Sequence, residues 1–105
     1  MAEYDMEIVS IVSIEPKQVK LRLVPVRLPG SSGNVIFFTQ ERMEKIQQAI
    51  TEYHLKGSEE PLRVNLGKLG FFCFDGVPVL VMSKADIEMM LQVIAEFSLK
   101  MEMAK

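Results

Sequence analysis

The chain has 105 residues, of which 49% are hydrophobic and 25% are charged; this composition excludes a disordered chain and fits one domain around one core. The net charge of −2 argues against proteins that live on nucleic acid or anionic membrane, because these usually carry a basic excess. The first residues are acidic, no apolar run is long enough to cross a bilayer, and Cys73 is the single cysteine, so we expect a cytoplasmic domain without an intrachain disulfide.

Two strands are expected at the start of the chain, because residues 4–15 and 19–28 largely alternate between apolar and polar side chains. A turn at Pro16 joins them. The alternation changes phase at Val24–Pro25. Since proline lacks an N–H group, we expect the second strand to lie at a sheet edge or to carry a bulge there. The first strand is expected to present one apolar face made of Met6, Ile8, Val12 and Ile14.

A strand followed by a helix is predicted next. Residues 35–38 are a short apolar run, and Thr39 has a side chain suited to cap the helix that follows. Gly57 is expected to end this helix. The buried stripe of the helix is predicted to contain Met43, Ile46, Ile50 and Tyr53.

The second half of the chain repeats this plan. Residues 62–66 alternate as a strand does, and the segment FFCFDGVPVLV contains Asp75–Gly76, the dipeptide typical of a tight hairpin turn. Ser83 is expected to cap the last helix, and Asp86 lies where the second residue of a capping box would stand.

The predicted element order is βββα–βββα, an α+β fold in a single domain (1–105), with a largely antiparallel sheet and two helices on one face. Aligning Val35 with Val79 brings eight pairs of apolar positions and the pair Glu44 and Glu88 into register. The chain is therefore either a duplication with pseudo-repeats 1–57 and 58–105, or two unrelated instances of a buried strand that feeds a capped helix.

The last helix has more apolar surface than one sheet face covers. Its polar residues form one narrow strip, and an exposed apolar patch of several hundred Å² is unusual in a protein without a partner. We therefore expect a homodimer formed through this helix, or else a helix at the centre of the domain. The expected interface residues are Met89, Met90, Val93, Phe97 and Met101.

No pattern in the sequence predicts a catalytic, cofactor or metal site. His54 is the single histidine and cannot form a zinc site alone, and a pair with Cys73 requires the fold to join them. The glycine- and serine-rich loop at residues 29–34 lacks the lysine ending of a phosphate-binding loop.

A basic cluster on the first hairpin supports a second interpretation, in which one sheet face holds single-stranded nucleic acid. The helices of FFTQERMEKIQQAI and VMSKADIEMMLQVI follow strands in an arrangement that resembles the positive-cofactor-like and whirly folds. That resemblance implies single-stranded DNA binding and dimerisation through helices, but no binding residue is transferred. The basic residues are Lys17, Lys20, Arg22 and Arg27.

The leading functional hypothesis is a non-enzymatic interaction or adaptor module, which self-associates through its last helix and binds a protein partner through its methionine-rich surface or an open sheet edge. Nucleic-acid binding is the alternative.

Overall fold

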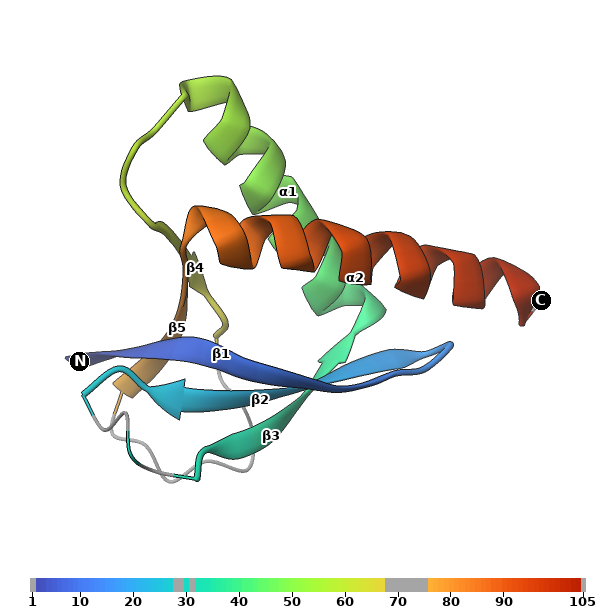
Figure 1. Ribbon diagram of the computed structural model, residues 1–105, viewed down its shortest axis with the longest axis horizontal. Helices are drawn as coiled ribbons and strands as arrows, with labels where there is room; N and C mark the ends of the chain where they lie inside the picture. Colours follow the sequence, from blue (N-terminus) through green and yellow to red (C-terminus); the bar gives the residue numbers. More distant parts are fainter. Residues whose placement is uncertain (1, 28–29, 31, 68–75, 105) are drawn as a thin grey trace.

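The computed structural model describes residues 2–27, 30, 32–67 and 76–104. A five-stranded sheet has the strand order β3-β2-β1-β5-β4, and both helices pack against one of its faces (Figure 1). The predicted α+β class is therefore confirmed. The elements are β1 (Ala2–Ile14), β2 (Gln18–Pro25), β3 (Asn34–Thr39), α1 (Gln40–Lys56), β4 (Leu62–Asn65), β5 (Gly76–Met82) and α2 (Lys84–Met103).

The sheet is largely antiparallel, as predicted. β1, β2 and β3 form an antiparallel meander, and β4 pairs antiparallel with β5. The exception is the parallel pair between β1 and β5, which spans only residues 2–6 of β1. α1 carries the chain from β3 at one edge of the sheet to β4 at the other edge. The second half of β1 therefore forms, with β2, a long hairpin that extends past β5.

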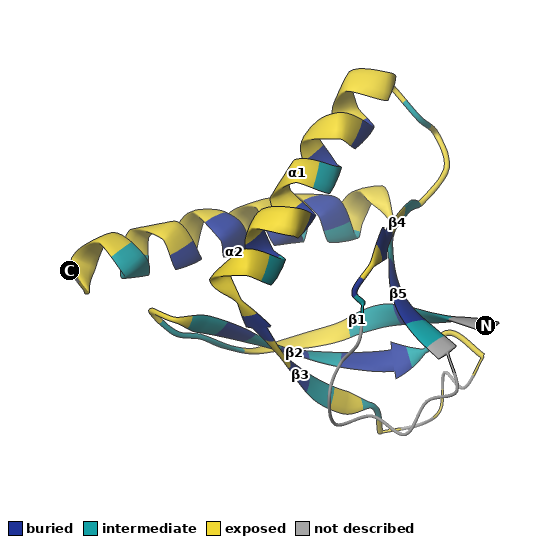
Figure 2. Cartoon of the chain, turned by 180° about the vertical axis from the view of Figure 1, so that it is seen from behind, coloured by how far each residue is buried: buried dark blue, intermediate teal, exposed yellow. Residues whose placement is uncertain are grey.

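The core lies between the sheet and the two helices, and the buried residues of both layers are on the sides that face each other (Figure 2). In α1 the predicted stripe is confirmed, since its four residues are the buried ones of the helix. In the sheet, alternate residues point inward from each strand. The strand residues of the core include Met6, Val19, Leu21, Leu23, Ile36, Phe38, Val64, Leu80 and Met82.

Two bulges interrupt β1. The register with β2 shifts after Ile8 and again after Ile11, so that Val9 and Val12 are extra residues. Ile11 then lies opposite Leu21 and shares its face, because directly opposed residues point to the same side of a sheet. Val12 has no partner in this register and is 45% exposed, so it does not join Met6 in the core as expected. Simple alternation fails here because each bulge adds one residue and reverses the phase.

The sequence predicted an edge strand or a bulge at Val24–Pro25. β2 as a whole lies inside the sheet, between β3 and β1, and its register with β1 is unbroken at these two residues, so neither alternative is correct. Pro25 is the last residue of the strand, and pairing with β3 has already ended at Leu23. Its missing N–H therefore breaks no hydrogen bond to β3. The next residue, Val26, donates its N–H to the carbonyl oxygen of Asp5 at 2.8 Å. This hydrogen bond lies at the end of the β1–β2 pair.

The helix ends follow the sequence closely. Ser83 and Asp86 form both hydrogen bonds of a capping box, and Gly57 ends α1 with φ of 62°. Thr39 occupies the N-cap position of α1, but its side chain makes no capping hydrogen bond. Asp75 of the predicted turn and the strand expected before it lie outside the described residues, while Gly76 is the first residue of β5. The duplication stays a prediction.

Candidate functional site

α2 runs over the sheet and packs on β1, β5 and α1 of its own chain (Figure 1). The Lys100 ammonium donates to the Ile14 carbonyl at 2.7 Å and fixes the C-terminal half of the helix over the hairpin end. Met90, Val93 and Phe97 are at most 3% exposed. Three of the five residues expected at a dimer interface therefore belong to the core of this chain, while Met89 and Met101 are half-buried.

A different set of α2 side chains faces solvent. Leu91, Leu99 and Met103 are 40%, 60% and 76% exposed, and Ala95 is exposed between them. These four residues recur at every fourth position, so they form one continuous row along the helix. We call this row the α2 ridge. The sequence did not single it out, because its side chains resemble the buried ones and their spacing is equally helical.

A groove of about 250 Å³ separates α1 from the C-terminal half of α2. Its floor consists of apolar side chains from both helices, and its rim carries the carboxylates of Glu44 on α1 and Glu102 on α2. Glu44 accepts a hydrogen bond from the side-chain amide of Gln40 at 3.1 Å. The apolar lining residues are Met43, Ile94, Phe97 and Met101. Phe97 and Met101, expected at an interface, thus line this groove.

No protein-family model matches the chain, and neither the curated proteins nor the solved structures include a match. The resemblance to the positive-cofactor-like and whirly folds receives no support from these comparisons. Functional inference therefore depends on the chemistry of the surface.

The four basic residues of the nucleic-acid hypothesis do not form one patch. Lys17 lies in the turn before β2 and Arg27 lies beyond its far end, ten residues away along the strand, or roughly 30 Å at the rise of an extended chain. Lys20 and Arg22 do share the helix-free face of β2, since the residues between and beside them point into the core. The structure thus brings together two of the four.

Lys20 lies among both acidic and aromatic neighbours. Its ammonium is 3.2 Å from a carboxylate oxygen of Glu15 and 5.3 Å from the centroid of the Phe37 ring. Hydrogen bonds from Ser13 and from Lys20 lower the pKa of Glu15 below its ordinary value. Phe37 is 43% exposed and lies opposite Lys20 in the register of β2 and β3. An aromatic ring beside a cation is the arrangement that base stacking on a nucleic-acid surface uses.

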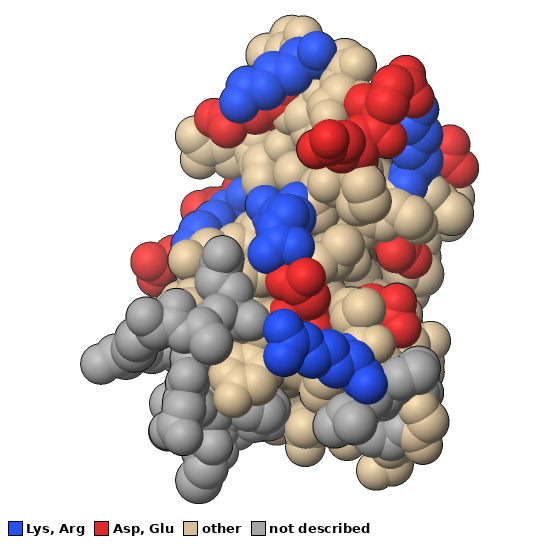
Figure 3. All heavy atoms as spheres, turned by 90° about the vertical axis from the view of Figure 1, so that its left-hand side faces the viewer, with Lys and Arg blue, Asp and Glu red and all other residues tan. Residues whose placement is uncertain are grey.

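Acidic residues interrupt the positive charge elsewhere. Arg63 donates two hydrogen bonds to Asp5, at 2.8 and 2.9 Å. This donation holds the pKa of Asp5 below its ordinary value of 3.8, although desolvation acts in the opposite direction. Figure 3 shows positive and negative side chains intermixed on the described part of one end of the molecule. Such mixing favours a general protein surface over a phosphate-binding one.

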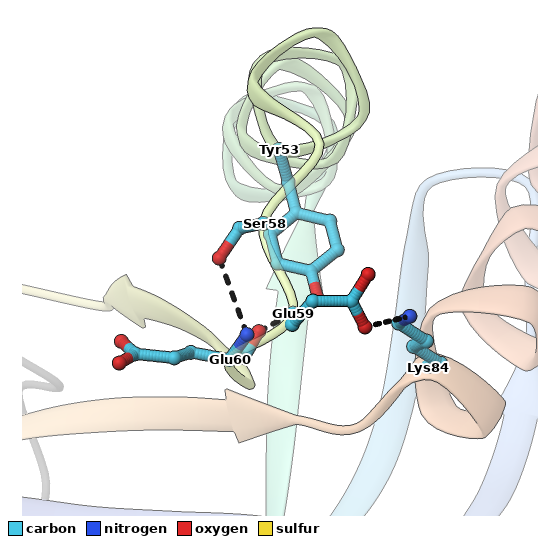
Figure 4. A network of polar contacts seen from close by, with 5 residues as sticks. All are labelled: Tyr53, Ser58, Glu59, Glu60 and Lys84. Atoms are coloured by element: carbon cyan, nitrogen blue, oxygen red, sulfur yellow. Dashed lines mark hydrogen bonds and ion pairs between the residues drawn. The ribbon is translucent and has the colours of Figure 1, made fainter.

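A second hollow, of about 260 Å³, lies where the end of α1 meets the start of α2. Four of its polar lining residues already make structural contacts (Figure 4): Tyr53, Ser58, Glu59 and Lys84. The Tyr53 hydroxyl donates to the Glu60 carbonyl at 2.6 Å, and Lys84 pairs with Glu59 at 2.8 Å. This pairing lowers the pKa of Glu59 and raises that of Lys84. His54 lines the hollow beside Tyr53.

Within the described part of the chain, no group of three or more His, Cys, Asp or Glu side chains comes together that could hold a metal ion. Cys73 lies outside the described residues, so the pairing with His54 is not placed. Among the described helices, neither is long and apolar enough to cross a membrane.

Proposed function

We propose that this protein is a cytoplasmic, non-enzymatic interaction module that self-associates through α2. The α2 ridge carries the proposal, because it places a continuous row of exposed apolar side chains along this helix. Burying a leucine or methionine that is otherwise exposed contributes about 1.5–3 kcal/mol. The proposed self-association uses the residues of the α2 ridge instead of Met90, Val93 and Phe97, because these three are buried within one chain.

A twofold dimer suits the ridge. In such a dimer each copy presents the same surface to the other, and rows of residues spaced by four pack between the rows of a facing helix. Ala95 lies in the middle of the ridge, where its small side chain lets two helices approach closely. Polar residues flank the row, with Gln92 and Glu96 along one side, as the rim of an interface requires.

The proposal is tested by multi-angle light scattering over a range of micromolar concentrations. The wild-type chain is expected to approach twice its monomer mass, and the double variant Leu99→Gln with Met103→Gln is expected to remain monomeric. Leu55→Gln is the matched control, because Leu55 is an 82% exposed leucine on α1 rather than on the ridge. A monomeric wild type, or an equal loss in the control, contradicts the proposal.

Single-stranded nucleic-acid binding is the second candidate function, favoured by the position of Phe37 beside Lys20 and near Arg22. Binding of a mixed oligonucleotide in this case decreases steeply with salt and is lost when Lys20→Glu and Arg22→Glu are combined. The control exchanges two exposed lysines of α1, Lys45→Glu with Lys56→Glu, and alters the net charge equally. No binding at low salt, or equal loss in both variants, excludes this function.

A further inference from the structure

The groove between α1 and α2 combines an apolar floor with an acidic rim. Met43 and Phe97 are 2% and 3% exposed and give the floor a fixed shape, whereas Met101 is half-buried and adaptable. Glu44 and Glu102 place two carboxylates at the rim, on opposite helices. The remaining polar lining residues are two glutamines and a serine, and the described lining includes no lysine or arginine.

We propose that this groove receives an arginine side chain from an amphipathic segment of a partner protein. Arginine has an apolar stem and a planar cation, so that the stem can lie on Met43, Phe97 and Met101 while the guanidinium reaches the carboxylates. Arginine is also among the residues that most often anchor protein interfaces. The volume of about 250 Å³ lies below the usual range of small-molecule sites, which favours a single inserted side chain.

This inference goes beyond self-association, because the groove and the α2 ridge are different surfaces of one helix. The methionines distinguish them: Met43 and Met101 line the groove, whereas Met103 belongs to the ridge. Met6 and Met82 are fully buried in the core and act as internal controls. A chain labelled with ¹³C at the methionine methyl groups therefore reports separately on each surface.

The probe is a fluorescein-labelled, acetylated helical peptide of alanine, leucine and arginine, with leucine and arginine four residues apart. Its control is the same peptide with citrulline in place of each arginine, which retains the shape and removes the charge. We expect saturable binding to the wild-type chain in low salt and at least about tenfold weaker binding of the citrulline peptide, because charge-assisted hydrogen bonds are lost. The methyl signals of Met43 and Met101 are expected to shift, while those of Met6 and Met82 stay in place.

Protein variants complete the test. The double variant Glu44→Gln with Glu102→Gln keeps side-chain size and is expected to weaken binding of the arginine peptide by about tenfold or more. Glu41→Gln with Glu52→Gln, two exposed carboxylates of α1 outside the groove, is expected to leave binding unchanged. Self-association should persist in both variants, so a failure of the groove to bind the peptide can be distinguished from a failure of the α2 ridge to mediate self-association.

Several results overturn the inference. These are absence of peptide binding at low salt, equal affinity for the citrulline peptide, and an equal loss in the control variant. A peptide-induced shift confined to Met103 places the peptide on the ridge instead. A shift of Met43 and Met101 that grows with protein concentration alone shows that a second copy of the chain fills the groove.

Discussion

Replacement of Met90 by alanine separates a core role of α2 from an interface role. Met90 is 0% exposed within a single chain, so Met90→Ala removes buried apolar atoms and leaves a cavity. Together these effects cost about 2–5 kcal/mol for a buried methionine, out of a total stability of about 5–15 kcal/mol for a domain of this kind. With a urea dependence of about 2 kcal/mol per M, the unfolding midpoint should decrease by roughly 1–2.5 M.

The assay is urea unfolding followed by circular dichroism at two protein concentrations tenfold apart. The loss in Met90→Ala should be the same at both concentrations, because the side chain packs inside one chain. Leu55→Ala is the control, since an 82% exposed side chain outside the α2 ridge changes the unfolding free energy by less than about 0.5 kcal/mol. A loss below about 1 kcal/mol in Met90→Ala, or a loss that vanishes on dilution, refutes the assignment of this residue to the core.

Three further predictions concern stability. Ser83→Ala removes the capping box of α2 and should lower the unfolding free energy by about 1 kcal/mol in urea melts; an unchanged midpoint contradicts this. Tyr53→Phe leaves the Glu60 carbonyl without its donor, and calorimetry should show a loss of about 1 kcal/mol, whereas no loss indicates a replacement donor. Because Arg63 lowers the pKa of Asp5 from 3.8, their pair stabilises the folded state above that pH and is lost as pH falls through the lower folded-state pKa. Since both side chains are well exposed, the wild type should exceed Arg63→Met by at most about 1 kcal/mol near pH 6 and lose that advantage in acid; a pH-independent difference rules this out.

The sequence predicted the features that depend on local chemistry. The four-residue stripe of α1, the capping box at Ser83 and the left-handed end at Gly57 each follow from neighbouring residues. The α+β class follows because strand and helix periodicities alternate along the chain. None of these features requires knowledge of which strands are neighbours.

The features that the sequence did not predict depend on strand order and register. Periodicity does not show that β2 lies inside the sheet. It also does not show that bulges at Val9 and Val12 shift the alternation of inward and outward side chains along β1. The wide apolar surface of α2 suggests a second chain, because periodicity does not show that Val93 and Phe97 join the core of their own chain. With these side chains in the core, the large apolar side chains of α2 that remain exposed are those of the α2 ridge.

The contact made by the α2 ridge is the most direct test of the proposed self-association. A sample that mixes methionine-methyl-labelled and unlabelled chains gives filtered nuclear Overhauser effects only between different copies. The proposal predicts intermolecular effects at Met103, which is 76% exposed on the ridge, and none at the half-buried Met89 outside it. Effects at Met89 alone, or no intermolecular effect at millimolar concentration, contradict self-association through this ridge.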